Sequence, residues 1–177
     1  ALLNAILGRA QRACCNEVAE VMETMQASTA DDLEARFVEM FRAEWRAQRG
    51  DAPLRTVLIV DDDPTAQYLA PEFALARQMF ENHGLVAAVA DARALHWRDG
   101  QLWHAALPGV PVDLIYNRLT DFDLSDPAHA ALRAAYEEGA CVMTPHPRVH
   151  ALQADKRNLI TLGDDAHPVA DDHRLDD

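Results

Sequence analysis

Three consecutive aspartates stand out among the residues whose types and spacing could do chemistry. Asp61, Asp62 and Asp63 follow the apolar run TVLIV at residues 56–60 and precede Pro64. A short apolar run without alternation, bounded by turn residues, is typical of a strand buried on both faces. The aspartates would then lie at the carboxyl end of that strand, where open α/β sheets bind ligands. Two interpretations stay open: a metal or ligand site, or a solvated turn in which one aspartate caps the next element.

Polar side chains also follow a later apolar run, VDLIY. Asn117 and Arg118 end this run, and Thr120 is close behind. We predict that all three lie at the ligand-binding edge of the sheet, because the guanidinium of an arginine offers a planar fork to a carboxylate or phosphate. The alternative for Arg118 is a structural ion pair with Asp121 or Asp123.

His146 follows the run CVMT and is predicted to contact substrate at the same edge. Its spacing to His150 would suit a metal on one helix face, but Pro147 lies between them and no third ligand is evident. Cys141 opens the same run, and we interpret it as a core residue and not as a nucleophile.

Strands and helices must position these residues. We predict four strands, at residues 56–60, 85–90, 112–116 and 141–144. Helices are predicted from Pro71 to His83, from a cap at Ser125 or Asp126 to Gly139, and over residues 149–162. This alternation predicts an α/β fold with a Rossmann-like, mostly parallel sheet and helices on both faces.

Three regions are predicted along the chain. Helical periodicity over residues 1–27, and again to about residue 48, predicts an N-terminal helical hairpin at 1–50. The Rossmann-like domain follows at 51–163. Within it, Asp99 and Gly100 predict a two-residue hairpin turn, across which Trp97 and Trp103 are expected to pack. The acidic tail at 164–177 is expected to be disordered.

Composition excludes several classes of function. The formal net charge is −13, with 29 acidic and 16 basic residues, so binding to nucleic acid or to an anionic membrane is disfavoured. The three cysteines show no metal-binding spacing, which indicates reduced thiols in a cytoplasmic protein. No apolar run approaches the length of a membrane span.

The segment IVDDDP and the loop that it opens can be compared with two kinds of domain, one that binds dinucleotides and one that accepts a phosphoryl group. The loop DDDPTAQY contains no glycine, which excludes a dinucleotide site there. The segment also resembles the opening of response-regulator receiver domains, which implies paired acids that bind Mg²⁺, a phosphoacceptor aspartate and a later Lys-Pro. Asn117 stands at the phosphoacceptor position, and the single lysine, Lys156, lies in the last predicted helix. A receiver-like, Mg²⁺-binding signalling or protein-binding module without catalysis therefore stays as the alternative.

A broader resemblance covers residues 56–162. This stretch looks like the pre-ATP-grasp domain of circularly permuted ATP-grasp proteins, the group that includes glutathionylspermidine synthase-like ligases. The segments that carry the resemblance are IVDDDP, YLAPEF, DLIYNRLTDF, TPHPR and ADKRNL.

The resemblance implies an ATP-dependent carboxylate–amine ligase that acts through an acyl phosphate, with ATP and Mg²⁺ as cofactors of the parent protein. Lys156 would contact the nucleotide phosphates and Arg118 would orient the acceptor or the carboxylate. The implied partners are small carboxylate and amine substrates and the remaining ATP-grasp domain. The family's Glu-x-Asn metal-binding segment and most of its ATP-binding domain are not visible, so we expect this chain to be a fragment that forms one wall of the site and does not hydrolyse ATP alone.

Overall fold

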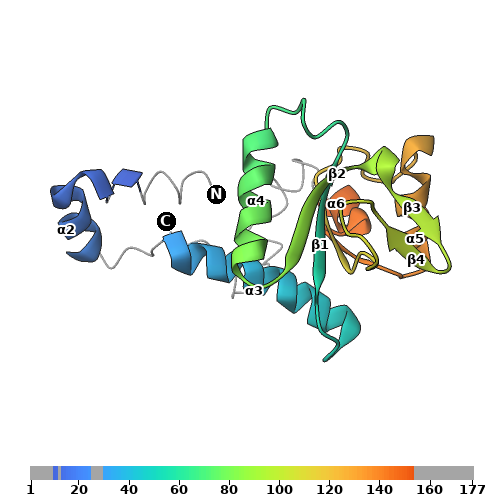
Figure 1. Cartoon of the computed structure of the whole chain (residues 1–177), viewed down its shortest axis with the longest axis horizontal. Coiled ribbons are helices and arrows are strands. Elements are labelled where there is room, and N and C mark those ends of the chain that lie inside the picture. The colour runs from blue at the N-terminus through green and yellow to red at the C-terminus, as the bar shows by residue number, and fades with distance from the viewer. Residues whose placement is uncertain (1–9, 12, 25–29, 154–177) are drawn as a thin grey trace, which may run out of the picture.

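The computed structural model describes residues 10–11, 13–24 and 30–153 (Figure 1). Four strands form one sheet in the order β2-β1-β5-β6, and every neighbouring pair is parallel. The strands are β1 (Thr56–Asp61), β2 (Val86–Asp91), β5 (Leu114–Asn117) and β6 (Val142–Thr144). The predicted α/β fold with a parallel, Rossmann-like sheet is confirmed.

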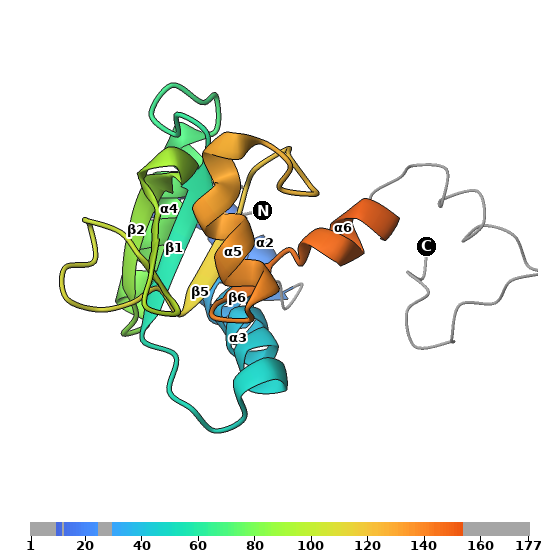
Figure 2. The same ribbon diagram turned by 90° about the vertical axis from the view of Figure 1, so that its right-hand side faces the viewer.

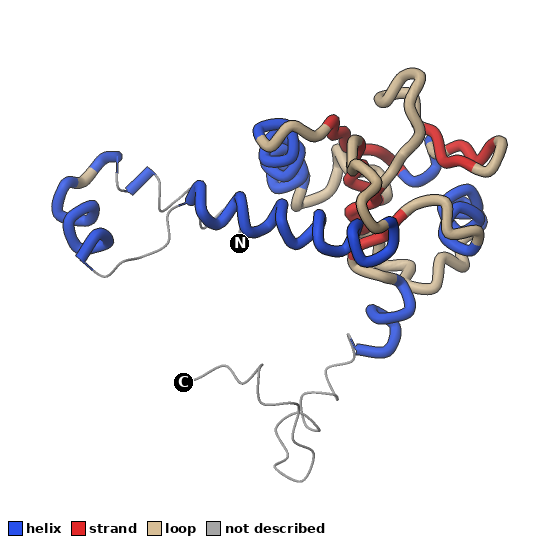
Figure 3. Tube along the Cα trace, turned by 90° about the horizontal axis from the view of Figure 1, so that it is seen from below, coloured by secondary structure: helices blue, strands red, loops and turns tan. Residues whose placement is uncertain are grey.

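Helices flank the sheet on both faces. The helices in the described part of the chain are α2 (Asn16–Thr24), α3 (Ala30–Arg49), α4 (Ala70–Asn82), α5 (Ala130–Glu137) and α6 (Pro147–Gln153). Of these, α3 and α4 pack on one face of the sheet and α5 packs on the other. Two short 3₁₀ turns, η1 (Ala92–Ala94) and η2 (Pro127–His129), follow β2 and precede α5. A two-stranded sheet of β3 (His96–Arg98) and β4 (Gln101–Trp103) completes the fold and lies apart from the main sheet in Figure 3.

The alternation of side chains along β1 explains why other elements pack on both faces of the sheet. Leu58 and Val60 pack with residues of α5 and of the β3–β4 hairpin, whereas Val57 and Ile59 pack with α3 and α4. Successive side chains of a strand point to opposite faces, so one apolar run supplies the core on both sides. We call these two faces of the sheet the α5 side and the α3 side. Figure 2 looks onto the sheet with α5 in front.

The long helix α3 buries one stripe of apolar residues. Val38, Phe41 and Trp45 are buried, and the Phe41 ring lies 5.0 Å from that of Phe80 and 5.1 Å from that of Tyr116. Gly50 follows the helix with a φ of +58° and donates its N–H to the carbonyl of Arg46. A glycine in this left-handed conformation ends the helix at little cost.

The β3–β4 hairpin corrects one prediction. Its turn is formed by Asp99 and Gly100, both with positive φ, as predicted. Trp97 pairs with Leu102, however, and Trp103 pairs with His96, so the two indoles lie on opposite faces of the hairpin. The prediction that the tryptophans pack across the hairpin is therefore wrong. Trp97 packs on the core, while the Trp103 ring lies 5.3 Å from the Arg98 guanidinium.

Several predicted boundaries shift, and others lie outside the described residues. The third long strand covers residues 114–117 instead of 112–116, and α6 begins at Pro147 instead of residue 149. Lys156, the predicted helix beyond residue 153, the tail at 164–177 and the connection at 25–29 lie outside the described residues. The N-terminal helical hairpin therefore stays a prediction. None of the helices in the part of the chain that the structure describes has the length and apolar character needed to cross a bilayer.

Candidate functional site

The strand order places a topological switch point between β1 and β5. The chain leaves β1, forms β2 on one side of it and returns to form β5 on the other. Val60 pairs with Asn117, and the N–H of Arg118 donates to the carbonyl of Val60 at 2.9 Å. The predicted ends of these two strands therefore meet at one edge of the sheet, where ligands of open α/β folds bind.

The alternation of side chains divides this carboxyl edge into two halves. Along β5, Leu114 and Tyr116 face the α3 side, and Ile115 faces the α5 side. By the same alternation Arg118 continues the α3 side and Asn117 the α5 side.

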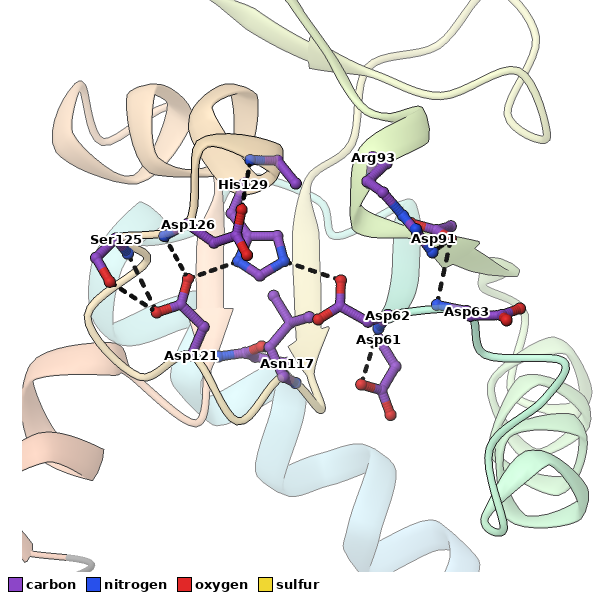
Figure 4. A network of polar contacts seen from close by, with 12 residues as sticks. Asp61, Asp62, Asp63, Asp91, Arg93, Asn117, Asp121, Ser125, Asp126 and His129 are labelled. Carbon is purple, nitrogen blue, oxygen red and sulfur yellow. Dashed lines mark hydrogen bonds and ion pairs between the residues drawn. The ribbon is translucent and has the colours of Figure 1, made fainter.

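The aspartates that end β1 divide in the same way. Asp61 follows Ile59 on the α3 side, and Asp62 follows Val60 on the α5 side. Figure 4 shows the carboxylates of Asp61 and Asp62 pointing in different directions. The aspartate triplet is therefore not one acidic pocket.

A buried histidine organises the α5 side. The side chain of His129 is 1% exposed, and its two ring nitrogens each contact a carboxylate (Figure 4). Nδ1 lies 2.6 Å from Oδ2 of Asp121, and Nε2 lies 2.9 Å from Oδ1 of Asp62. Burial alone would lower the pKa of His129, but the hydrogen bonds with Asp62 and Asp121 outweigh it, so the pKa is raised.

Asp121 is held in place by the chain that follows it. Its carboxylate accepts the backbone N–H groups of Ser125 at 3.1 Å and Asp126 at 3.0 Å. Burial would raise the pKa of Asp121, but these N–H groups and His129 outweigh it, so the pKa lies well below its ordinary value. Asp126 caps η2 by accepting the N–H of Ala128, which confirms it as one of the two predicted caps.

Asn117 and Asp63 have local structural partners. Asn117 is buried, and its Oδ1 accepts the N–H of Leu119 at 3.1 Å. Asp63 has a φ of +40°, and its N–H donates to Asp91 at 3.2 Å. Asp91 forms a two-bond ion pair with Arg93, whose hydrogen bonds lower the Asp91 pKa to about 2 despite some burial. Thr120 is exposed in the loop after β5.

Arg118 dominates the α3 side. It is half-buried, and its guanidinium folds back over the Tyr116 ring at 5.5 Å with the phenol oxygen 3.4 Å away. Among the described residues, no carboxylate lies within ion-pair distance of Arg118. The alternative of an ion pair with Asp121 or Asp123 is thus not what the structure shows.

Asp61 lies near this cation. Burial raises the pKa of Asp61, although the N–H of Asp62 and the positive charge of Arg118 work in the opposite direction. Its Oδ1 accepts the N–H of Asp62 at 2.9 Å. The α3 side therefore places a partly desolvated carboxyl group in the electrostatic range of the Arg118 guanidinium.

The end of β6 adds two buried polar atoms without partners. Thr144 pairs with Tyr116, so its side chain also faces the α3 side. Neither Oγ1 of Thr144 nor Nδ1 of His146 has a hydrogen-bond partner in the described structure. The other ring nitrogen of His146 lies 3.3 Å from the Tyr136 hydroxyl. His150 instead stacks on Phe122 with ring centroids 3.9 Å apart, so the two histidines of the possible metal pair contact different rings.

A cavity of about 380 Å³ lies beside the first loop of the site, between α4 and β2. Its lining includes Pro64, Phe73 and Arg77 but not Arg118 or Asp61. Across the described residues, no group of three His, Cys, Asp or Glu side chains is arranged to hold a metal ion.

Two residues of this edge, His129 and Thr144, were not predicted from the sequence. For His129 one signal was present, because it precedes the buried Leu132 by three residues, which is one spacing of a buried helix face. The approach of Asp62, 67 residues earlier in the chain, had no local signal.

Comparison with known proteins does not assign the chain to a family. It matches no protein-family model, and no curated protein shows significant similarity to it. The functional argument therefore rests on the motifs of the sequence and on the geometry of the carboxyl edge.

Proposed function

We propose that the α3 side of the carboxyl edge binds the carboxylate of a small substrate, with Arg118 as the main contact. The observation that carries this proposal is the half-buried guanidinium at the switch point, which no described carboxylate neutralises. Arg42, Arg49 and Arg133, which are also half-buried and have no described ion pair, donate to backbone carbonyls, whereas Arg118 has only a phenol oxygen at 3.4 Å. A bidentate carboxylate would match the planar fork of the guanidinium and supply the missing charge.

Neighbouring groups extend the proposed site. Thr144 offers a buried hydroxyl without a hydrogen-bond partner among the described residues. Nδ1 of His146 is in the same state, while its other ring nitrogen contacts Tyr136 of α5. Buried polar atoms without partners are costly in a folded protein, and a ligand that hydrogen-bonds with them would remove that cost. The substrate contacts of Asn117 and Thr120 stay predictions, because Asn117 lies on the α5 side with Leu119 as its partner and Thr120 is exposed in the loop after β5.

On this basis, and on the resemblance of residues 56–162, we propose the reaction of a carboxylate–amine ligase. The substrate carboxylate attacks the γ-phosphorus of ATP, which gives an acyl phosphate and releases ADP. An amine then attacks the acyl carbon, which gives an amide and releases phosphate. Lys156 would bind nucleotide phosphates in this scheme, and the remaining ATP-grasp domain would hold most of the ATP and Mg²⁺. The free cysteines Cys14, Cys15 and Cys141 support a cytoplasmic location for the protein.

The test uses the protein as encoded in its full coding sequence and, in parallel, the 177-residue chain. With ATP, Mg²⁺ and a panel of amino acids and dicarboxylates, added hydroxylamine should trap the acyl phosphate of an accepted substrate as a hydroxamate. Arg118→Ala should raise the KM for that carboxylate by at least about tenfold. Arg77→Ala is the matched control, because Arg77 is an exposed arginine on α4. Robust ATP turnover by the 177-residue chain alone would contradict the proposal of a partial site.

A receiver-like, Mg²⁺-binding module is the second candidate, favoured by one observation. The order β2-β1-β5-β6, with acids after β1, matches the flavodoxin-like order in which receiver domains are built. This candidate predicts Mg²⁺ affinity that disappears when Asp61 and Asp62 are replaced by alanine, and phosphorylation by acetyl phosphate. The bond between His129 and Asp62 favours the first proposal, because it occupies one of the two acids.

A further inference from the structure

We propose that His129 is a positioning residue: as an imidazolium bonded to two carboxylates, it holds the loop after β1 against the loop after β5 and fixes the carboxyl edge of the sheet. The two carboxylates, Asp62 and Asp121, come from segments that the sheet brings together at its switch point. The proposal rests on the proposed function only in treating this edge as the ligand-binding site. The contact itself is independent of any ligand.

The geometry favours the protonated ring. Both Nδ1 and Nε2 lie within hydrogen-bond distance of a carboxylate oxygen, at 2.6 and 2.9 Å. A neutral imidazole carries one N–H, so one of its nitrogens would present a lone pair to an oxygen lone pair. Only the imidazolium donates to both carboxylates, and both bonds are then charge-assisted. This argument holds whichever tautomer the neutral ring would prefer.

The charges that surround His129 also favour the proton. Acidic groups lie in the loop after β1, at the end of β2 and in the loop after β5, and two of them, Asp62 and Asp121, contact the ring. One arginine lies in η1 and one in α5. These groups are Asp61, Asp62, Asp63, Asp91, Arg93, Asp121, Asp123, Asp126 and Arg133. Arg93 is paired with Asp91, and Arg133 donates to the carbonyl of Leu124. The net field at His129 is therefore negative.

The two ends of the bridge are held unequally. Asp121 keeps backbone N–H groups from Ser125 and Asp126 whether or not His129 is charged. The Asp62 side chain is 47% exposed, and its carboxylate is held by the hydrogen bond from the His129 ring. Loss of the proton should therefore release Asp62 and leave Asp121 in place. The segment that moves carries Asp61, which faces the proposed carboxylate site.

The test is a pH titration of the intact chain with ¹⁵N-labelled histidine, followed by long-range ¹H–¹⁵N spectra. Both ring nitrogens of His129 should show imidazolium shifts at pH 6, with a midpoint above the ordinary value of 6.5. His104 is an internal contrast, because burial and the nearby His96 lower its pKa. Asp62→Asn should lower the His129 midpoint by about one pH unit. Asp63→Asn removes the same charge from the next residue without touching His129 and should change the midpoint far less.

The backbone amides of residues 61–63 supply a second readout. Their shifts should follow the His129 midpoint in the unmodified chain and follow the lowered midpoint in Asp62→Asn. A neutral ring at pH 6, equal midpoints in the two variants, or amide shifts that do not follow the titration would each overturn the proposal. These spectra need no ligand, so their failure leaves the Arg118 proposal intact. A failure of Arg118 to bind carboxylate would equally leave the result for His129 standing.

Discussion

The two sides of the carboxyl edge differ in how far their polar groups are satisfied. On the α5 side, His129 contacts both Asp62 and Asp121, and backbone N–H groups donate further hydrogen bonds to Asp121. On the α3 side, Arg118 has a phenol oxygen at 3.4 Å and, among the described residues, no ion pair, and the Thr144 hydroxyl has no partner there.

This difference separates a structural role from a ligand-binding role within one edge. A saturated network stabilises the fold and gains little from a further partner, because its donors and acceptors are already used. An unsaturated group at a switch point loses part of its desolvation cost only when a ligand binds. Substitutions should therefore affect mainly stability on the α5 side and mainly binding on the α3 side.

The largest expected effect is on the α5 side. His129→Ala removes the cation between two carboxylates and should lower the free energy of unfolding by roughly 3 kcal/mol at pH 6. The backbone N–H groups still bond to Asp121 in this variant. The loss of unfolding free energy should therefore lie near the lower end of the range that is usual when one partner of a buried ion pair is removed. Urea unfolding of the intact chain measures it. The matched change on the other side, Arg118→Ala, should cost about 1 kcal/mol or less, because it removes the contact with the Tyr116 ring. Equal losses in the two variants would erase the distinction between the two sides.

Two threonines, one with a bonded hydroxyl group and one without a described partner, test the comparison further, because a change to valine removes only the hydroxyl group. The Thr56 hydroxyl accepts the N–H of Asp113 at 2.8 Å and donates to the carbonyl of Pro111 at 2.9 Å. Thr56→Val leaves both groups without a partner and should cost about 1 to 2 kcal/mol. Thr144→Val removes a hydroxyl without a partner in the described structure and should be neutral within about 0.5 kcal/mol. A larger loss from Thr144→Val than from Thr56→Val, by thermal or urea unfolding, would show that Thr144 is already satisfied.

The pH dependence of stability should report the α5 network. Because the folded pKa of His129 is raised, its contribution is complete below the ordinary value of 6.5 and is lost as pH rises through the raised pKa. Because the pKa of Asp121 is lowered, its contribution is complete above 3.8 and is lost as pH falls toward the lowered pKa. Urea midpoints should therefore be highest between these limits. His129→Gln should flatten the alkaline decline, and an unchanged decline would assign it to other groups.

The smallest expected effect concerns Asp61. Burial raises its pKa, so the ionised carboxylate is less favourable in the folded chain above that pKa than in the unfolded chain. Asp61→Asn keeps the oxygen that accepts the Asp62 N–H and should stabilise the fold by a few tenths of a kcal/mol at pH 7. The gain should vanish below pH 3.8, where the carboxyl group is protonated in both states. Destabilisation at pH 7 would mean that the Arg118 charge outweighs burial.

The sequence was informative where local patterns decide the structure. The run at residues 56–60 predicted β1, and the end of that run predicted the edge of the sheet on which Asp61 and Arg118 lie. The Asp99-Gly100 turn also determined which residues pair in the hairpin, because a two-residue loop pairs residue 97 with 102 and not with 103. The expected contact between the tryptophans ignored that constraint.

The sequence alone did not predict contacts between distant segments of the chain. Asp62 and His129 are 67 residues apart, and their contact depends on the order of the strands and on the path of the chain after β5. The division of the aspartate triplet between two faces follows from alternation. Its consequence, one carboxylate bound by His129 and another near Arg118, required the packing of α5 against the hairpin and the sheet.

The most direct test of the central claim is an NMR titration of the ¹⁵N-labelled chain with L-glutamate and succinate as carboxylate probes. We expect shifts at the Arg118 side chain and at the backbone of Asp61 and Thr144, with the His129 ring unchanged, and we expect Arg118→Ala to abolish them while Arg77→Ala does not. Shifts that persist in Arg118→Ala, or that centre on His129, would contradict the assignment of ligand binding to the α3 side.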